Sequence, residues 1–278
     1  MTDKIKQFVC LAGLPRTGST LLSSILCQNP EIHAEGNSAV CQIMFDMYNS
    51  CVFNANEQLT ACNRKETPHD FLSQIPDIYY KKCKGQIIVD KCRAWTCKKN
   101  ISILKNYMCE DYKIIVLERP ITEIVKSFAR LYVENNIEKD LDILFTPNSE
   151  PIMRSINDIN NLKFEINNNK ENYENYKNYE NYENYENHFL FISYDELVNN
   201  TEVTIQKIYT FCGWEPFKHD FQNVVTKYPE NDSVYFLKGL HDIRPNVEKK
   251  NNQIQIPENI LEKCKMIDKI MGYLPVTK

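Results

Sequence analysis

Residues 8–22 read Phe8-Val9-Cys10-Leu11-Ala12-Gly13-Leu14-Pro15-Arg16-Thr17-Gly18-Ser19-Thr20-Leu21-Leu22. The segment from Phe8 to Ala12 is apolar, as in a buried strand, and a glycine-containing loop and a helical apolar pattern follow it. In such a unit the backbone N–H groups of the loop and the positive end of the helix dipole converge on anionic oxygens. The stretch therefore predicts a phosphate-binding loop, and the alternative is an ordinary tight turn.

The loop departs from the triphosphate-binding pattern GxxxxGK[ST] at one position. Gly13, Gly18 and Thr20 fit the pattern, but Ser19 stands where the lysine belongs. That lysine contacts the β- and γ-phosphates of a triphosphate. Arg16 lies earlier in the loop and would face the end of a shorter phosphate chain.

A second candidate anion site follows the apolar run Ile114–Leu117. Arg119 stands at the carboxyl end of this predicted strand, and Ser127 lies eight residues further on, in the predicted helix. A guanidinium fork and a hydroxyl can together hold a separate phosphate. Taken alone, an arginine at such a strand end more often forms an ordinary surface ion pair.

Apolar runs alternate with helix-period segments along the chain, which predicts a parallel sheet covered by helices on both faces, an α/β fold of three layers. The strands are predicted at Phe8–Ala12, Gln86–Val89, Lys113–Leu117 and Phe189–Ile192. The helices are predicted at Ser19–Cys27, Ala39–Cys51, His69–Lys82, Ile101–Met108, Ile121–Glu134, Glu202–Cys212 and Glu258–Met271.

A low-complexity tract at residues 167–187 interrupts the pattern. Its tyrosines recur every third residue among Asn, Glu and Lys, so on a helix they would spiral around the axis and form no single face. We expect a mobile surface insertion or a frayed helix extension. Residues 1–278 are accordingly predicted to form a single domain with this insertion.

The composition excludes several classes of protein. The chain has 278 residues, 42% of them hydrophobic, and a net charge of −4, which argues against a nucleic-acid binder. It has no apolar run of the roughly 20 residues that a membrane span needs, and residues 1–7 do not resemble a signal peptide. Eleven cysteines without a CxxC pair indicate reduced thiols and no metal site. We expect a cytoplasmic protein without a membrane partner.

The two anion sites in combination resemble the nucleotide-binding signature of the sulfotransferases that use 3′-phosphoadenosine 5′-phosphosulfate (PAPS), with motifs in the style of the tyrosylprotein and bacterial-type branch. Tyr194, at a predicted strand end, resembles the family's nucleotide-contacting tyrosine, and Phe236-Leu237-Lys238-Gly239 resembles its late basic loop. The resemblance implies a metal-independent sulfuryl transfer with adenosine 3′,5′-bisphosphate (PAP) as product. The nucleotide-binding residues it implies are Pro15, Arg16, Thr17, Gly18, Ser19, Thr20, Arg119, Ser127, Tyr194, Lys238 and Gly239.

There are four catalytic candidates, three of which the resemblance suggests. Arg16 would hold the 5′-phosphosulfate, and Lys91 would reach the bridging oxygen of the leaving group. Glu35 is the candidate general base by resemblance, although the family's Gly-Glu order is reversed here as Glu35-Gly36. His241, in a polar run, is the second candidate base. An exposed loop glutamate and a strand-end ion pair are the alternative interpretations of Glu35 and Lys91.

The acceptor cannot be identified from the sequence. A small molecule, a glycan or a peptide with a hydroxyl or amine would each fit, and the sequence leaves the oligomeric state open, a homodimer included. A P-loop small-molecule kinase is the alternative enzyme, against which Ser19 and the Arg119–Ser127 pair count. A nucleotide-binding protein without catalysis is the third alternative.

Overall fold

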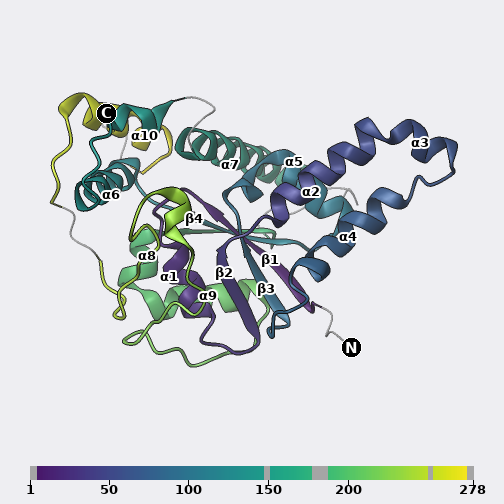
Figure 1. Cartoon of the computed structure of the whole chain (residues 1–278), viewed down its shortest axis with the longest axis horizontal. Helices are drawn as coiled ribbons and strands as arrows, with labels where there is room; N and C mark the ends of the chain where they lie inside the picture. The colour runs from purple at the N-terminus through teal and green to yellow at the C-terminus, as the bar shows by residue number, and fades with distance from the viewer. Residues whose placement is uncertain (1–4, 147–150, 177–186, 250–252, 274–278) are drawn as a thin grey trace.

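The fold is built on a five-stranded parallel sheet. A computed structural model describes residues 5–146, 151–176, 187–249 and 253–273. The sheet has the strand order β2-β3-β1-β4-β5, and every neighbouring pair is parallel (Figure 1). The strands are β1 (Gln7–Gly13), β2 (Ile32–Asn37), β3 (Ile87–Lys91), β4 (Lys113–Glu118) and β5 (Phe189–Ser193). The predicted α/β fold class is confirmed.

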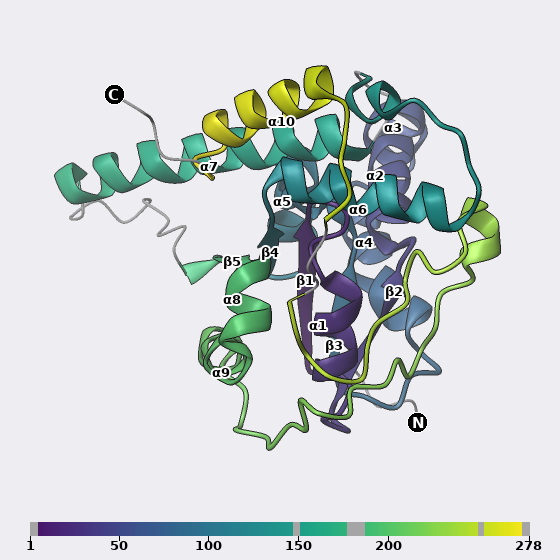
Figure 2. The ribbon, with the colours of Figure 1, turned by 90° about the vertical axis from the view of Figure 1, so that its left-hand side faces the viewer.

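Helices connect the strands and cover both faces of the sheet. The α-helices are α1 (Ser19–Leu26), α2 (Val40–Asn49), α3 (Asn56–Ala61), α4 (Thr67–Tyr79), α5 (Lys98–Tyr107), α6 (Ile121–Glu134), α7 (Pro151–Tyr176), α8 (Tyr194–Asn199), α9 (Thr201–Cys212) and α10 (Glu258–Ile270). Shorter turns of helix are η1 (Ser50–Asn54), η2 (Arg93–Thr96), η3 (Leu141–Phe145) and η5 (Asp232–Tyr235). Helices α2, α3 and α4 extend away from the sheet on one side, and α10 packs against α6 (Figures 1 and 2).

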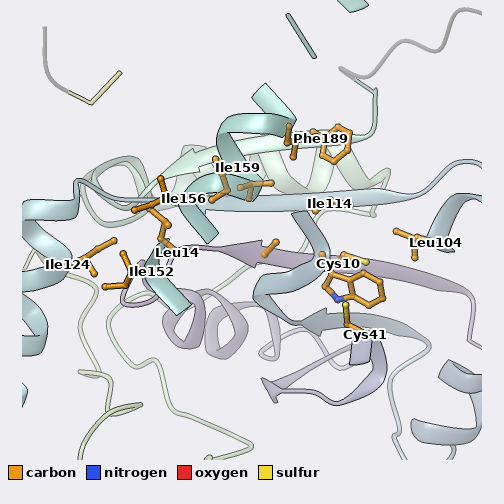
Figure 3. Packing of buried hydrophobic residues seen from close by; sticks show 14 of the residues in the cluster. Cys10, Leu14, Cys41, Leu104, Ile114, Ile124, Ile152, Ile156, Ile159 and Phe189 are labelled. Atoms are coloured by element: carbon orange, nitrogen blue, oxygen red, sulfur yellow. The ribbon is translucent and has the colours of Figure 1, made fainter. Parts of the chain in front are cut away.

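Alternation along the strands divides the core into two layers. In β1, Cys10 and Ala12 belong to one buried cluster, while Val9 and Leu11 belong to the other. The first cluster joins the sheet to α2, α5, α6 and α7, and Figure 3 shows its packing. The second joins the sheet to α1 and α9. Because both faces are buried, the strands are almost continuously apolar, which is why they could be recognised in the sequence.

The sequence predicted four of the strands and missed β2. This strand lies at the edge of the sheet, paired only with β3, and its sequence Ile-His-Ala-Glu-Gly-Asn carries a polar half. A strand with one neighbour needs no apolar run, so it leaves little periodic signal. Glu35 accordingly lies in a strand, not in the loop that the alternative interpretation assumed.

Three helices, α3, α7 and α8, were not among those predicted. Helix α8 begins at Tyr194, where the sequence suggested only a strand end, and Ser193 and Glu196 form a capping box at its start. Helix α7 runs through Tyr176 and so includes the first part of the tyrosine tract. The rest of that tract, residues 177–186, lies outside the described residues. In the described part of the chain, no helix is both long and apolar enough to cross a membrane.

The strand registers bring the candidate site residues to one edge of the sheet. Leu11 pairs with Lys91, Gly13 with Leu117, and Glu118 with Ser193. The loop after β1, the end of β3 and the start of the segments after β4 and β5 are therefore neighbours. Ligands of open parallel sheets bind at this carboxyl edge.

Candidate active site

A cavity of about 410 Å³ lies at the carboxyl edge of the sheet. It is bordered by the phosphate loop after β1, by Lys91 at the end of β3, and by Arg119 and Ser127 from the β4–α6 connection. Tyr194 at the start of α8 and the segment around His241 complete its walls. Five separate segments therefore converge on one space, as the strand order requires.

The loop backbone adopts conformations that favour glycine. Gly13 has φ 136° and Gly18 has φ 86°. A Cβ on Gly13 would lie 2.2 Å from the carbonyl oxygen of Leu117, so no side chain fits there. Arg16 also has a positive φ, 62°, a conformation rare for a residue with a side chain. The buried Thr17 hydroxyl donates to the Leu14 carbonyl across 2.7 Å and holds the loop closed.

Arginines crowd the anion-binding side of the cavity. Arg16 donates from Nε to the Ser127 hydroxyl at 3.1 Å and from Nη1 to the Leu240 carbonyl. Burial, Arg119 and Arg130 together lower the pKa of Arg16 to about 10. Mutual repulsion of buried guanidinium groups is relieved by an anion, so this cluster favours a phosphate or sulfate group.

Arg119 is held in place but keeps unused donor capacity. Its Nη1 donates to the Arg16 carbonyl at 2.9 Å, and its guanidinium carbon lies 4.1 Å from the centre of the Tyr194 ring. Its buried Nε has no hydrogen-bond partner among the described residues. Burial lowers the pKa of Arg119. A buried donor without a partner costs free energy unless a ligand accepts from it.

Lys91 follows a buried polar network at the end of β3. Asp90 is fully buried and accepts hydrogen bonds from Ser38, from Tyr80 at 2.7 Å and from Trp95 at 2.7 Å. Burial raises the pKa of Asp90, and the three hydrogen bonds oppose that rise. Trp95 is thereby fixed in the core by its N–H group. The network holds Asp90 in place, and so it also fixes the backbone position of the adjacent Lys91.

Two acidic residues that do not themselves line the cavity contact Lys91 and His241. Lys91 Nζ lies 2.5 Å from Glu230 Oε1, and the same oxygen lies 3.4 Å from His241 Nε2. The other ring nitrogen of His241, Nδ1, lies 2.6 Å from Asp232 Oδ1. His241 is thus placed between two carboxylates at the cavity wall.

Most of the residues proposed from the sequence lie together. Those that line the cavity are Pro15, Arg16, Gly18, Ser19, Thr20, Lys91, Arg119, Ser127, Tyr194 and His241. Thr17, Glu35, Lys238 and Gly239 are not among the lining residues. The Glu35 carboxylate lies 3.2 Å from His33 Nε2, and the Lys238 backbone exchanges hydrogen bonds with the Asn135 side chain.

Sequence reasoning missed the acidic pair Glu230 and Asp232, and also Arg130. The two acidic residues stand in a loop that has no helical or strand periodicity. The one available signal was that they shortly precede the polar run that contains His241. Arg130 follows Ser127 by three residues and so lies on the same helix face, a signal that was available. Among the described residues, no group of three or more His, Cys, Asp and Glu side chains could hold a metal ion.

The fold is α/β, and the glycine-containing loop after β1 and the Arg119–Ser127 pair, which the sequence predicted as anion sites, border one cavity. A model of the sulfotransferase family matches residues 9–219, and the chain belongs to this family. The match covers the phosphate loop, Lys91, Arg119, Ser127 and Tyr194, but not the segment from Glu230 to His241. No curated protein matched the sequence.

Solved structures support the same fold. The sulfotransferase domain of the olefin synthase from Synechococcus PCC 7002 is similar with a TM-score of 0.52 and 16% identity, over 98% of this chain and 97% of that chain. The sulfotransferase domain from the curacin biosynthetic pathway gives 0.51 and 15%, over 98% and 100%. A sulfotransferase from Alicyclobacillus acidocaldarius gives 0.50 and 10%, over 98% and 95%. At these identities the likeness concerns the fold alone.

Proposed function

We propose that this protein transfers a sulfuryl group from PAPS to a hydroxyl or amine of an acceptor. The observation that carries the proposal is the convergence of the phosphate loop, Lys91 and the Arg119–Ser127 pair on one cavity. Two separate anion sites suit a donor that carries phosphate at two positions of its ribose. Membership of the sulfotransferase family supports the transferase activity.

The residues present fit such a donor. The buried Nε of Arg119 has no partner among the described residues and can donate to a 3′-phosphate, beside the Ser127 hydroxyl. Gly18, where a Cβ would lie 3.0 Å from the Tyr194 ring, keeps the loop backbone close to that ring. The loop N–H groups, Ser19 and Thr20 would bind the 5′-phosphosulfate. PAPS, when bound, supplies an activated sulfuryl group with a nucleotide phosphate as leaving group.

The protein's own cations would stabilise charge during transfer. Lys91 and Arg16 both border the cavity and would neutralise the charge that develops on the leaving phosphate. Sulfuryl transfer resembles phosphoryl transfer in needing in-line positioning and electrostatic stabilisation. Such cations contribute roughly 10² or more to turnover. No step of this proposal requires a metal ion.

His241 is the better supported of the two candidate bases. It borders the cavity, whereas Glu35 does not and is paired with His33. The carboxylate of Asp232 accepts from the His241 backbone N–H at 3.1 Å and also contacts Nδ1, which leaves Nε2 on the Lys91 side. A histidine oriented in this way can take the proton of an acceptor hydroxyl. The acceptor would be a small molecule, a glycan or a peptide.

The test is calorimetric titration with PAP and, separately, with ATP and magnesium. We expect metal-independent binding of PAP, weaker binding of ATP, and a loss of at least about 1.5 kcal/mol for PAP in Arg119→Ala, the scale of a charged hydrogen bond. Arg64→Ala is the matched control, because Arg64 is exposed and is not among the residues that line the cavity. Tighter binding of ATP with magnesium would favour the kinase alternative, and binding of neither nucleotide would overturn the proposal.

A further inference from the structure

Glu230 reaches the active site from a loop that follows α9. It stands 139 residues after Lys91 in the sequence, yet its side chain lies against β2 at Gly36. A Cβ on Gly36 would lie 2.1 Å from Glu230 Cγ and 2.8 Å from its Oε1. The glycine therefore provides the space in which the Glu230 side chain lies.

From this position one carboxylate contacts two residues of the cavity wall. Glu230 Oε1 accepts from Lys91 Nζ at 2.5 Å and lies 3.4 Å from His241 Nε2. Glu230 does not itself line the cavity, whereas Lys91 and His241 do. Its carboxylate thus contacts these two residues from outside the cavity. The Lys91 ammonium group has three N–H donors, so it can still donate to a ligand in the cavity.

The environment of Lys91 makes this contact electrostatically important. The side chains of Lys91 and Glu230 are 9% and 11% exposed. Burial lowers the pKa of Lys91, and Glu230 is the main group that raises it again. Two other charged groups act on Lys91: Arg93 from η2 lowers its pKa further, and Asp232 from the same segment as Glu230 raises it. Without its partner, a buried lysine tends to lose its proton.

We propose that Glu230 is a positioning residue of the sulfuryl-transfer site: seated on Gly36, its carboxylate holds the Lys91 ammonium toward the cavity and keeps His241 beside it. This inference rests on the proposed function, in which Lys91 must be charged to stabilise the leaving group. It also explains why a glycine stands at the polar end of β2. A bulkier residue at position 36 would push the carboxylate away from Lys91.

The direct test follows the titration of Lys91 in the full-length protein. Lysine labelled with ¹³C at Cε is observed by NMR between pH 6 and 11, and the Lys91 signal is assigned from its loss in Lys91→Arg. In Glu230→Gln we expect the pKa of Lys91 to fall by about one unit or more relative to the wild type, since the neutral amide cannot stabilise the ammonium. Glu215→Gln, at an exposed position that does not line the cavity, is the matched control and leaves the titration unchanged.

A second variant keeps the carboxylate and moves it. Gly36→Ala introduces the Cβ that Glu230 cannot accommodate, so the pKa of Lys91 should fall there too, although no charge has been removed. This variant also decides the question if Glu230→Gln does not fold. An unchanged Lys91 titration in either folded variant would overturn the positioning role.

Binding of PAP separates this inference from the proposed function. We compare how far the affinity for PAP falls when the pH is raised from 7 to 9. This fall should be at least tenfold larger in Glu230→Gln than in the wild type, because neutral Lys91 cannot pair with a phosphate. Failure of the wild type to bind PAP at either pH would overturn the proposed function, while the Lys91 titration would still report on Glu230. Parallel pH profiles in both proteins would contradict the positioning role alone.

Discussion

Gly13 sets the geometry of the loop after β1, and Gly213 at the end of α9 provides a matched comparison. Gly13 and Gly213 both have positive φ, 136° and 68°, but only at Gly13 would a Cβ meet other atoms. We expect Gly13→Ala to lower the free energy of unfolding by roughly 3 kcal/mol, from strain and overpacking together. Gly213→Ala should cost about 1 kcal/mol, from strain alone. Urea unfolding measures both, and equal losses would contradict the steric argument.

Site residues that belong to short sequence motifs could be predicted from the sequence. Arg16 stands in a recognisable loop, and Arg119 and Ser127 stand eight residues apart across a strand–helix junction, so short-range spacing was enough to find them. Glu230 could not be found in this way. Its partner Lys91 lies 139 residues away in the chain, and the space that admits it depends on Gly36 in a third segment. Only the fold brings these three positions together.

Helix α10 contributes the N-terminal cap of α6, the helix that carries Ser127. Buried Asp268 accepts from the backbone N–H groups of Ile121 and Thr122 and, at 2.7 Å, from the Thr122 hydroxyl. We expect Asp268→Ala to lower the free energy of unfolding by about 2 kcal/mol, because it removes a cap and leaves buried donors without a partner.

The measurement for this helix–helix contact combines urea unfolding with amide hydrogen exchange. Exchange at Ile121 and Thr122 should become faster in Asp268→Ala. Glu262→Ala, at an exposed position of α10, is the control: it also replaces an acidic residue of α10 by alanine but removes no cap. It should have little effect on the unfolding free energy or on the exchange rates. Equal behaviour of the two variants would show that Asp268 does not cap α6.

Helices and strands could be predicted where their burial produces a simple hydrophobic pattern in the sequence. The strands β1, β3, β4 and β5 are apolar because helices cover both faces, and the sequence located all four. Edge strand β2 and helices α3, α7 and α8 were not predicted. For β2 and α8 the physical reasons can be named. The first has a polar end that meets Glu230 at Gly36, and the second is six residues long, too short for a helical period to be visible. Both elements border the site, where function and not packing selects the residues.

At the scale of the whole molecule, charge is distributed unevenly. The chain has a net charge of −4, which disfavours a broad basic surface. Even so, Arg119 and Arg130 lie close enough to Arg16 to lower its pKa, and Arg130 also lowers the pKa of Arg119. The repulsion within this cluster destabilises the ligand-free protein. A phosphate ligand that bridges the arginines therefore couples binding to global stability.

This coupling predicts a thermal shift. PAP at 100 times its dissociation constant should stabilise the wild type by about 2.7 kcal/mol, and so raise the unfolding midpoint by roughly 5 to 10 °C for a chain of this size. In Arg119→Ala the same PAP concentration should give less than about half that shift, because a contact to the phosphate is lost. Adenosine, which has no phosphate, should give none at equal concentration. Differential scanning calorimetry measures the shifts. Equal shifts in the two proteins would mean that the nucleotide binds away from Arg119, whereas a shift with adenosine would locate the binding energy in the base and ribose and not in the arginine cluster.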